Sequence, residues 1–145
     1  MSSNKIIVHT DGASRGNPGL AGAGIVVEGL SQKYALSFFL GNKTNNEAEY
    51  LAVLFALRLL NKLISEEAER KLLISSKVCF KMDSKLVVEQ LIGNWKVKNV
   101  RMKKFVDECK IQVESLGFPI LFEHVDRELN KQADWLANEA IDLAS

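Results

Sequence analysis

Three strand-like segments follow one another at the start of the chain, and their order limits the folds that it can adopt. Lys5 to Asp11, Leu20 to Glu28 and Lys33 to Leu40 are each rich in apolar residues, and only Gly29 to Gln32 separates the last two. Parallel neighbours need a long crossover connection, whereas short turns join antiparallel neighbours. The sequence therefore predicts a sheet whose first three strands are antiparallel.

Helical patterns alternate with two further strand patterns in the rest of the chain. Thr44 and Glu47 have the spacing of a capping box, which opens a helix to about Leu63 that is apolar on nearly all sides. The charged stretch Ser65 to Arg70 either ends this helix or adds a further turn. Strands are predicted at Lys77 to Met82 and Phe118 to Val125, and helices at Leu86 to Leu91, Arg101 to Leu116 and Asn130 to Ala144.

Bulk properties limit the class of protein more than its function. The 145 residues suit a single domain over residues 1–145, and 47% hydrophobic with 26% charged residues is a globular composition. No apolar run approaches the ~20 residues of a membrane span, and the N-terminus lacks an apolar signal region, so we expect a cytoplasmic protein. Cys79 and Cys109 lack metal-binding spacing and are expected to be buried free thiols.

Local charge is more informative than the net charge of +1. The segment from Gly93 to Val106 contains no acidic residue, and Trp95 stands at its head. Such a segment is either a surface that follows nucleic-acid phosphates or the solvated face of a helix. Its basic residues are Lys96, Lys98, Arg101, Lys103 and Lys104.

Four acidic residues occupy the ends of strands or the starts of helices. Taken singly, each has an ordinary explanation. Asp11 would be a turn residue before the glycine-rich stretch Gly12 to Asn17, and Asp83 or Ser84 a helix N-cap. Glu49 and Asp134 would be first-turn acids that the helix dipole stabilises.

Taken together, the same acids predict different chemistry. Gathered in space, carboxylates repel one another and raise each other's pKa unless a cation holds them, and Mg²⁺ prefers oxygen ligands. Two such ions about 4 Å apart activate water and stabilise a leaving oxygen at phosphorus. Sequence alone does not show whether the four acids converge.

The order of motifs resembles type 1 ribonuclease H over nearly the whole chain. The matching stretches are Asp11-Gly-Ala-Ser-Arg-Gly-Asn-Pro-Gly, Thr44-Asn-Asn-Glu-Ala-Glu49, Met82-Asp83-Ser84 and Asn130-Lys-Gln-Ala-Asp134-Trp-Leu-Ala. The resemblance implies an α/β, ribonuclease H-like fold: a mixed five-stranded sheet, its first three strands antiparallel, flanked by helices.

The resemblance also implies an endonuclease that hydrolyses the RNA strand of RNA/DNA hybrids and leaves 5′-phosphate and 3′-hydroxyl ends. Asp11 would bridge two Mg²⁺ ions, for which Mn²⁺ is an expected substitute. Glu49 and Asp83 would complete the shell of one ion, and Asp134 that of the other. The implied partner is a hybrid bound by a monomer, without a membrane, and double-stranded RNA is left open as a further partner.

Substrate contacts are implied at matching positions. Contacts to 2′-hydroxyl groups, which distinguish RNA from DNA, would come from Asn17, Asn45, Asn46 and Glu49, together with the backbone of Gly12, Ala13, Ser14 and Arg15. Thr44 and Asn17 would hold a DNA phosphate. Lys85 would face the hybrid, with Trp95, Lys96 and Lys98 in the basic segment.

Two departures from the family pattern stand out. Many relatives carry a longer basic handle after the short helix, whereas here Asn94 to Arg101 leads almost directly into the next helix, as in handle-less members. Many also carry a flexible histidine before the last helix, where this chain has only Asp126 to Leu129. Glu128 is the first candidate to replace it and Arg127 the second. His124 and His9 are interpreted as strand residues.

Two other functions compete with this interpretation. A binding module with the same fold, catalytically weak or inactive, would use the basic segment to hold hybrid or double-stranded RNA. A phosphatase that begins with an Asp-x-Asp motif would need a second acid at position 13, where this chain has Ala13. The four acids favour the enzyme.

Overall fold

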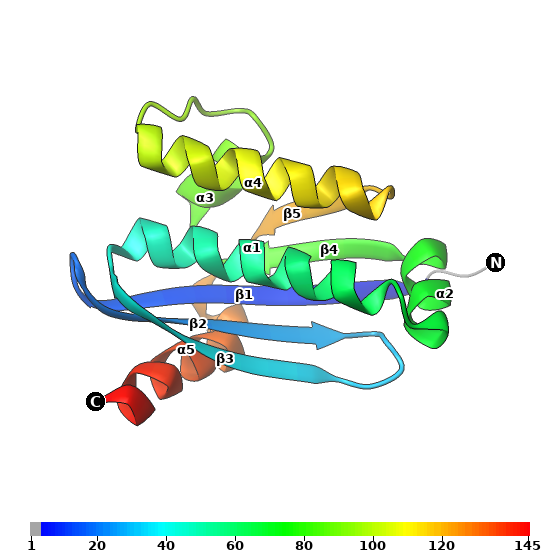
Figure 1. Cartoon of the computed structure of the whole chain (residues 1–145), viewed down its shortest axis with the longest axis horizontal. Helices are drawn as coiled ribbons and strands as arrows, with labels where there is room; N and C mark the ends of the chain where they lie inside the picture. Colours follow the sequence, from blue (N-terminus) through cyan, green and yellow to red (C-terminus); the bar gives the residue numbers. More distant parts are fainter. Residues whose placement is uncertain (1–3) are drawn as a thin grey trace.

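The computed structural model describes residues 4–145, and in this part of the chain five strands form one mixed sheet. The strand order across the sheet is β3-β2-β1-β4-β5 (Figure 1). β1 pairs antiparallel with β2, and β2 pairs antiparallel with β3, whereas β4 runs parallel to both β1 and β5. The predicted fold is confirmed.

Strand β1 spans Lys5–Gly16 and is longer than predicted. The prediction of a turn over Gly12 to Asn17 is wrong, because pairing with β2 continues until Gly16 lies opposite Gly19. Apart from Arg15, the paired residues from Gly12 to Gly16 have small side chains or none, and an extended backbone accommodates all of them. The turn is confined to Asn17 and Pro18, which a cis peptide bond joins.

Strands β2 (Gly19–Glu28) and β3 (Tyr34–Lys43) complete the antiparallel half of the sheet. The glycines of β2 permit close contact with a helix. A Cβ atom at Gly24 would lie 2.0 Å from the carbonyl oxygen of Ala133, and one at Gly22 would lie 2.2 Å from that of Ala137. The last helix therefore rests directly on the backbone of β2.

Helix α1 (Asn45–Leu63) begins with the predicted capping box. The Glu47 backbone N–H donates to Thr44 Oγ1 at 3.1 Å, and the Thr44 N–H donates to Glu47 Oε1 at 2.9 Å. These bonds satisfy amides that the first turn leaves without helical partners. Most of the helix is buried, and it crosses one face of the sheet beside α4 (Figure 1).

Helix α2 (Glu67–Ser75) is separate from α1 and lies near the turn between β2 and β3. The buried Glu69 carboxylate accepts hydrogen bonds from the Ser31 backbone N–H, at 2.9 Å, and from the Tyr34 hydroxyl. The charged stretch thus does more than end a helix, since it ties down the β2–β3 hairpin.

Strand β4 (Lys77–Met82) leads through Asp83 into helix α3 (Lys85–Leu91). Ser84, and not Asp83, caps α3, because its Oγ accepts from the Val87 N–H at 3.3 Å. Asp83 is thereby left for another role. Helix α4 (Val100–Leu116) follows, and the Asn99 side chain caps it.

Strand β5 (Ile120–His124), a short 3₁₀ helix (Arg127–Asn130) and helix α5 (Lys131–Ala144) end the fold. Helix α5 lies on the opposite face of the sheet from α1 and α4 (Figure 1). Its buried residues are the predicted stripe: Ala133, Leu136, Ala137, Ala140 and Ile141.

Two further expectations concern the cysteines and membrane spans. Cys79 and Cys109 are free and buried, as predicted. Among residues 4–145, no helix is long and apolar enough to cross a membrane.

Gly24→Ala tests the close packing of α5 on β2. The added methyl group would overlap the Ala133 carbonyl, so α5 must move or the chain must lose stability. We expect destabilisation of about 2 kcal/mol or more, measured as a lower thermal midpoint. Ala35→Gly, a change of similar size at an exposed position of β3, is the control, and an equal loss in both variants would contradict this packing.

Candidate active site and nucleic-acid interface

Three carboxylates meet where the parallel pairing of β1 with β4 ends. Asp11 lies two residues beyond the last β1–β4 pair, which joins His9 to Lys81, and Asp83 directly follows β4. Glu49 comes from the second turn of α1. One oxygen from each of Asp11, Glu49 and Asp83 lies within 4.8 Å of the others. The carboxyl ends of parallel strands are the usual binding edge of an open α/β sheet.

Glu49 reaches this edge because α1 approaches β1 closely at Gly12. A Cβ atom at Gly12 would lie 2.2 Å from the carbonyl carbon of Ala48 and 2.3 Å from the nitrogen of Glu49. No other residue type fits without moving the helix. The glycine after Asp11 therefore determines how far Glu49 stands from it.

Asp134 approaches from the other face of the sheet. Asp11 pairs with Gly24, whose missing side chain faces α5, so the Asp11 side chain and α5 share that face. The Asp134 carboxyl lies close enough to Asp11 to contribute to the raised pKa of Asp11. The Asn138 amide donates to Asp134 Oδ1 at 3.1 Å and so orients this carboxylate. The four predicted acids are thus brought together, with Asp134 beside the group of three.

Crowding and burial disturb the ionisation of this cluster. Asp11 is only 4% exposed. Burial first, and then the charges of Glu49 and Asp83, raise the pKa of Asp11 well above its ordinary value. Burial and the charge of Asp83 likewise raise the pKa of Glu49. Without a cation, the cluster therefore retains a proton that an isolated aspartate would lose.

The donor set fits a hard divalent cation. All the side-chain donors are carboxylate oxygens, the ligands that Mg²⁺ and Mn²⁺ prefer. Among the described residues, the buried Oε2 of Glu49 has no hydrogen-bond partner. A buried oxygen of this kind is costly unless something binds it.

The two loop candidates lie in different surroundings. Arg127 Nε lies 4.0 Å from Asp83 Oδ2, with its side chain 87% exposed. Glu128 instead lines a cavity of about 260 Å³ beside His9. His124 is the last residue of β5 and is exposed. Of the two candidates, Arg127 is thus the one that approaches the acidic cluster.

The tip of the β1–β2 hairpin is fastened to the start of α1. Ser14 N–H donates to Asn45 Oδ1 at 3.2 Å, and Asn45 N–H donates to Asn17 Oδ1 at 3.0 Å. These bonds use the oxygens of both amides and leave their NH₂ groups as donors. The Arg15 side chain turns to α5, where it lies 2.6 Å from Asp142.

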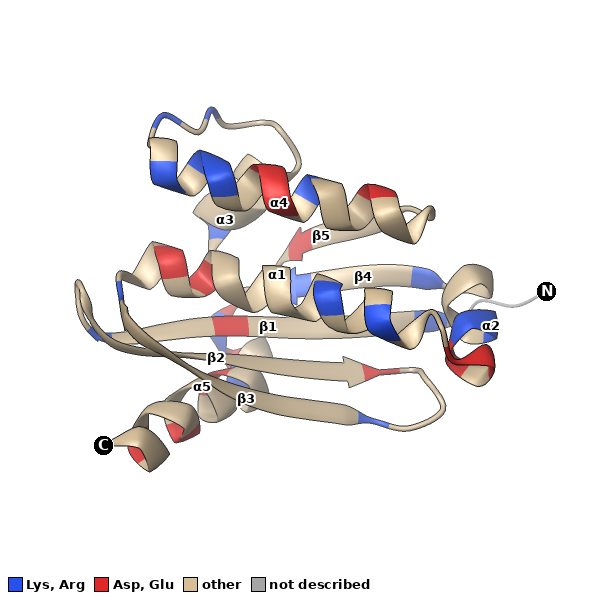
Figure 2. Ribbon diagram, in the orientation of Figure 1, with Lys and Arg blue, Asp and Glu red and all other residues tan. Residues whose placement is uncertain are grey.

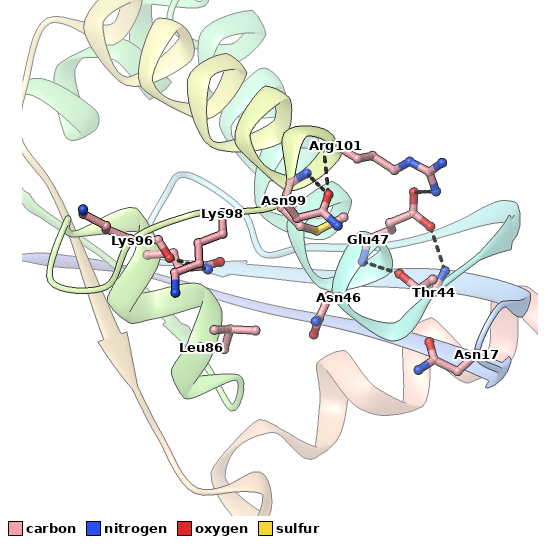
Figure 3. Close-up of a pocket in the computed structure, with 11 residues that line it drawn as sticks. Asn17, Thr44, Asn46, Glu47, Leu86, Lys96, Lys98, Asn99 and Arg101 are labelled. Atoms are coloured by element: carbon pink, nitrogen blue, oxygen red, sulfur yellow. Dashed lines mark hydrogen bonds and ion pairs between the residues drawn. The ribbon is translucent and has the colours of Figure 1, made fainter.

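Beside the hairpin tip lies a cavity of about 480 Å³ (Figure 3). One wall comes from the hairpin and α1, the other from α3, α4 and the loop between them. Figure 2 shows blue basic segments gathered on this loop and the first turns of α4. The predicted residues that line the cavity are Asn17, Thr44, Asn46, Lys96 and Lys98.

Some lining residues were missed and some predicted ones lie elsewhere. The structure adds Glu47, Leu86, Gln90, Asn99, Arg101 and Met102 to the lining. Arg101 lies 3.3 Å from the buried carboxylate of Glu47. Its place in the basic segment was a signal, but nothing in the sequence singles out Gln90. Lys85 and Trp95 are exposed nearby without lining the cavity.

Comparison with known proteins agrees with this geometry. The family model described as reverse transcriptase-like matches residues 9–140. A ribonuclease H of Chlorobium phaeobacteroides is 33% identical over 144 residues, covering 94% of this chain and 95% of the relative. The chain belongs to the type 1 ribonuclease H family.

Two more members of the family are informative. A bifunctional protein of Mycobacterium tuberculosis is 39% identical over 147 residues, covering 97% of this chain but only 36% of the relative. The chain thus spans about a third of the length of the first curated relatives that it matches. The crystal structure of a ribonuclease H1 named LC11, in complex with an RNA/DNA hybrid, has a TM-score of 0.84 and 37% identity, covering 96% and 98% of the two chains.

Asp11→Asn should stabilise the metal-free protein. An asparagine amide can donate a hydrogen bond to a neighbouring carboxylate, as the single O–H of a protonated Asp11 would, and it carries no charge to lose or gain. Because the folded pKa of Asp11 lies above its unfolded value, the wild type loses stability as the pH rises above about 4. In chelator at pH 8 we expect a thermal midpoint about 3 to 6 °C higher for the variant.

The stabilisation should shrink towards pH 5, where the wild-type cluster is more fully protonated. Asp107→Asn, at an exposed position of α4, is the control and should show no such pH dependence. A lower midpoint for Asp11→Asn at pH 8 would show that the cluster is not electrostatically strained.

Proposed function

We propose that this chain is an endonuclease that hydrolyses the RNA strand of RNA/DNA hybrids. The observation that carries the proposal is the convergence of Asp11, Glu49 and Asp83, with Asp134 beside them. Membership of the ribonuclease H family and the similarity to a structure that contains a hybrid support the substrate.

Two Mg²⁺ ions, or Mn²⁺ in their place, would be held by this cluster. Asp11 would be shared, since it contacts the acids on both sides. Glu49 and Asp83 would hold one ion, and Asp134 the other. When bound, such ions supply an activated water and stabilise the charge that develops at the phosphorus.

The protein's own contribution is to position the acids and the substrate. Gly12 and the α1 capping box hold Glu49 against Asp11, and Asn138 orients Asp134. Arg127 is better supported than Glu128 as the loop residue near the reacting phosphate, because it alone of the two pairs with Asp83. Hydrolysis would leave a 5′-phosphate and a 3′-hydroxyl.

The cavity beside the hairpin suits the DNA strand. Asn17, Thr44 and Asn46 offer polar groups on one wall, while Lys96 and Lys98 offer positive charge on the other. The amide NH₂ groups of Asn17 and Asn45, with the backbone from Gly12 to Arg15, would contact the hybrid between this cavity and the acids. Cations beside neutral donors are suited to backbone phosphates.

Asp83→Asn tests the enzyme against a binding module of the same fold. The Asp83 carboxylate is nearly buried and pairs only weakly with Arg127, so its loss should leave the fold intact. We expect the rate of cleavage of a labelled hybrid in Mg²⁺ to fall about 100-fold or more, with binding retained.

The control is again Asp107→Asn, which should cleave at the wild-type rate. Chelator should abolish cleavage by the wild type. Wild-type protein that binds the hybrid but never cuts it would favour the binding module, and a fully active Asp83→Asn variant would exclude the proposed metal site.

Replacing Lys96 and Lys98 by Ala tests the proposed DNA-strand contact. Each phosphate contact that is lost should reduce the slope of log affinity against log salt by about 0.9. We expect a reduction of about 1 to 2 and weaker hybrid binding at low salt. Replacing Lys71 and Lys77 by Ala, at exposed positions near α2, removes the same charge elsewhere. Equal slopes for both pairs would mean that the loop does not contact phosphates.

A further inference from the structure

The loop of residues 93–99, here called the basic loop, lies between α3 and α4. Its first half is held by the backbone of α3, because the Glu89 carbonyl accepts from Asn94 N–H at 2.9 Å and from Trp95 N–H at 3.1 Å. These bonds end before Lys96 and Lys98, the residues that line the cavity. Another contact must hold the second half.

Gln90 makes that contact. Its Nε2 donates to the Lys96 carbonyl oxygen at 3.3 Å, and its Oε1 accepts from the Tyr50 hydroxyl. Gln90 also lines the cavity. The side chain therefore bridges the basic loop and α1.

Tyr50 is a firm anchor for this bridge. It is fully buried, and it follows Glu49 directly in α1. Its ring stacks on Phe105 of α4, with centroids 6.1 Å apart and planes 10° from parallel. Through Gln90, the backbone of Lys96 is thus tied to the helix turn that carries an acid of the active site.

Val97 defines the rest of the loop geometry. It is partly buried against the core and stands between the two lysines. Apolar packing of Val97 limits how far the loop can move away from the core, but such packing is non-directional and does not fix the loop's lateral position. The hydrogen bond from Gln90 to the Lys96 carbonyl oxygen fixes that position.

We propose that Gln90 is a positioning residue, which holds the basic loop at a fixed place relative to the acidic cluster so that Lys96 and Lys98 meet the DNA strand. This inference rests on the proposed function. A loop that is already ordered loses less conformational entropy when it binds a phosphate. Loss of the bridge should therefore weaken substrate binding more than it slows the chemical step.

Gln90→Leu tests the proposal, because leucine keeps the size of the side chain and removes both hydrogen bonds. We expect the KM for a labelled hybrid to rise about 5-fold and kcat to change less than about 2-fold. The salt slope should fall by about 1. Tyr50→Phe should give a smaller effect in the same direction, and the double variant should resemble Gln90→Leu alone, because both changes break one bridge.

Gln32→Leu is the matched control. Gln32 also hydrogen-bonds to a tyrosine hydroxyl, that of Tyr34 at 3.3 Å, but it lies in the β2–β3 turn. The same substitution there should leave KM, kcat and the salt slope unchanged. Any general effect of losing a Gln–Tyr hydrogen bond would appear in both variants.

The fluorescence anisotropy of Trp95 reports the mobility of the basic loop and needs no measurement of activity. Trp135→Phe, at an exposed position of α5, leaves Trp95 as the one tryptophan of the chain. In that background Gln90→Leu should lower the anisotropy. Unchanged anisotropy and KM would overturn the inference, as would equal losses of kcat and thermal stability with KM unchanged. If the wild type cuts no hybrid, the proposed function fails, while a fall in both anisotropy and hybrid affinity would still support the role of Gln90.

Discussion

The close contact of α1 with β1 at Gly12 is the constraint on which the active site depends. A side chain at this position would overlap the backbone of Ala48, and a helix pushed away from the sheet would carry Glu49 with it. The capping box starts α1 at the point where this contact is possible, and the hairpin tip is fastened to the same turn through Asn45. Because Gly12 has no side chain, α1 can pack closely enough on β1 to bring Glu49 near Asp11.

Much of the fold follows from local chemistry, and that part could be predicted. The capping box and the stripe from Ala133 to Ile141 depend on residues a few positions apart, so their pattern is complete in the sequence. The second half of β1 was mistaken for a turn, because glycine, alanine and serine have weak preferences and their pairing partners lie on another strand. Helix α2 was missed for a similar reason, since it is stabilised by the buried Glu69, which binds a distant turn.

The active site likewise has some features that the sequence predicts and others that depend on distant parts of the chain. The four acids could be chosen through the resemblance of their motifs, but their convergence depends on the parallel pairing of β1 with β4 and on the packing of α1 and α5. Glu47 was recognised as a capping residue, whereas its pairing with Arg101 needs α4 to lie beside α1. The sequence does not identify Gln90 as a site residue, because its role depends on Tyr50 and Lys96, which only the fold brings near it.

The acids that meet around Asp11 of β1 come from helices on opposite faces of the sheet, and this has a thermodynamic consequence. Helix α1 and helix α5 lie on opposite faces, yet each contributes a carboxylate that helps to raise the pKa of Asp11. A cation held there would act as a cross-link between the two layers that exists only in the folded chain. Such a ligand adds RT ln(1 + [L]/Kd) to the free energy of unfolding, about 2.7 kcal/mol at 100 times its Kd. With such a cation bound, the stability of the contact between the two layers would depend on the free cation concentration.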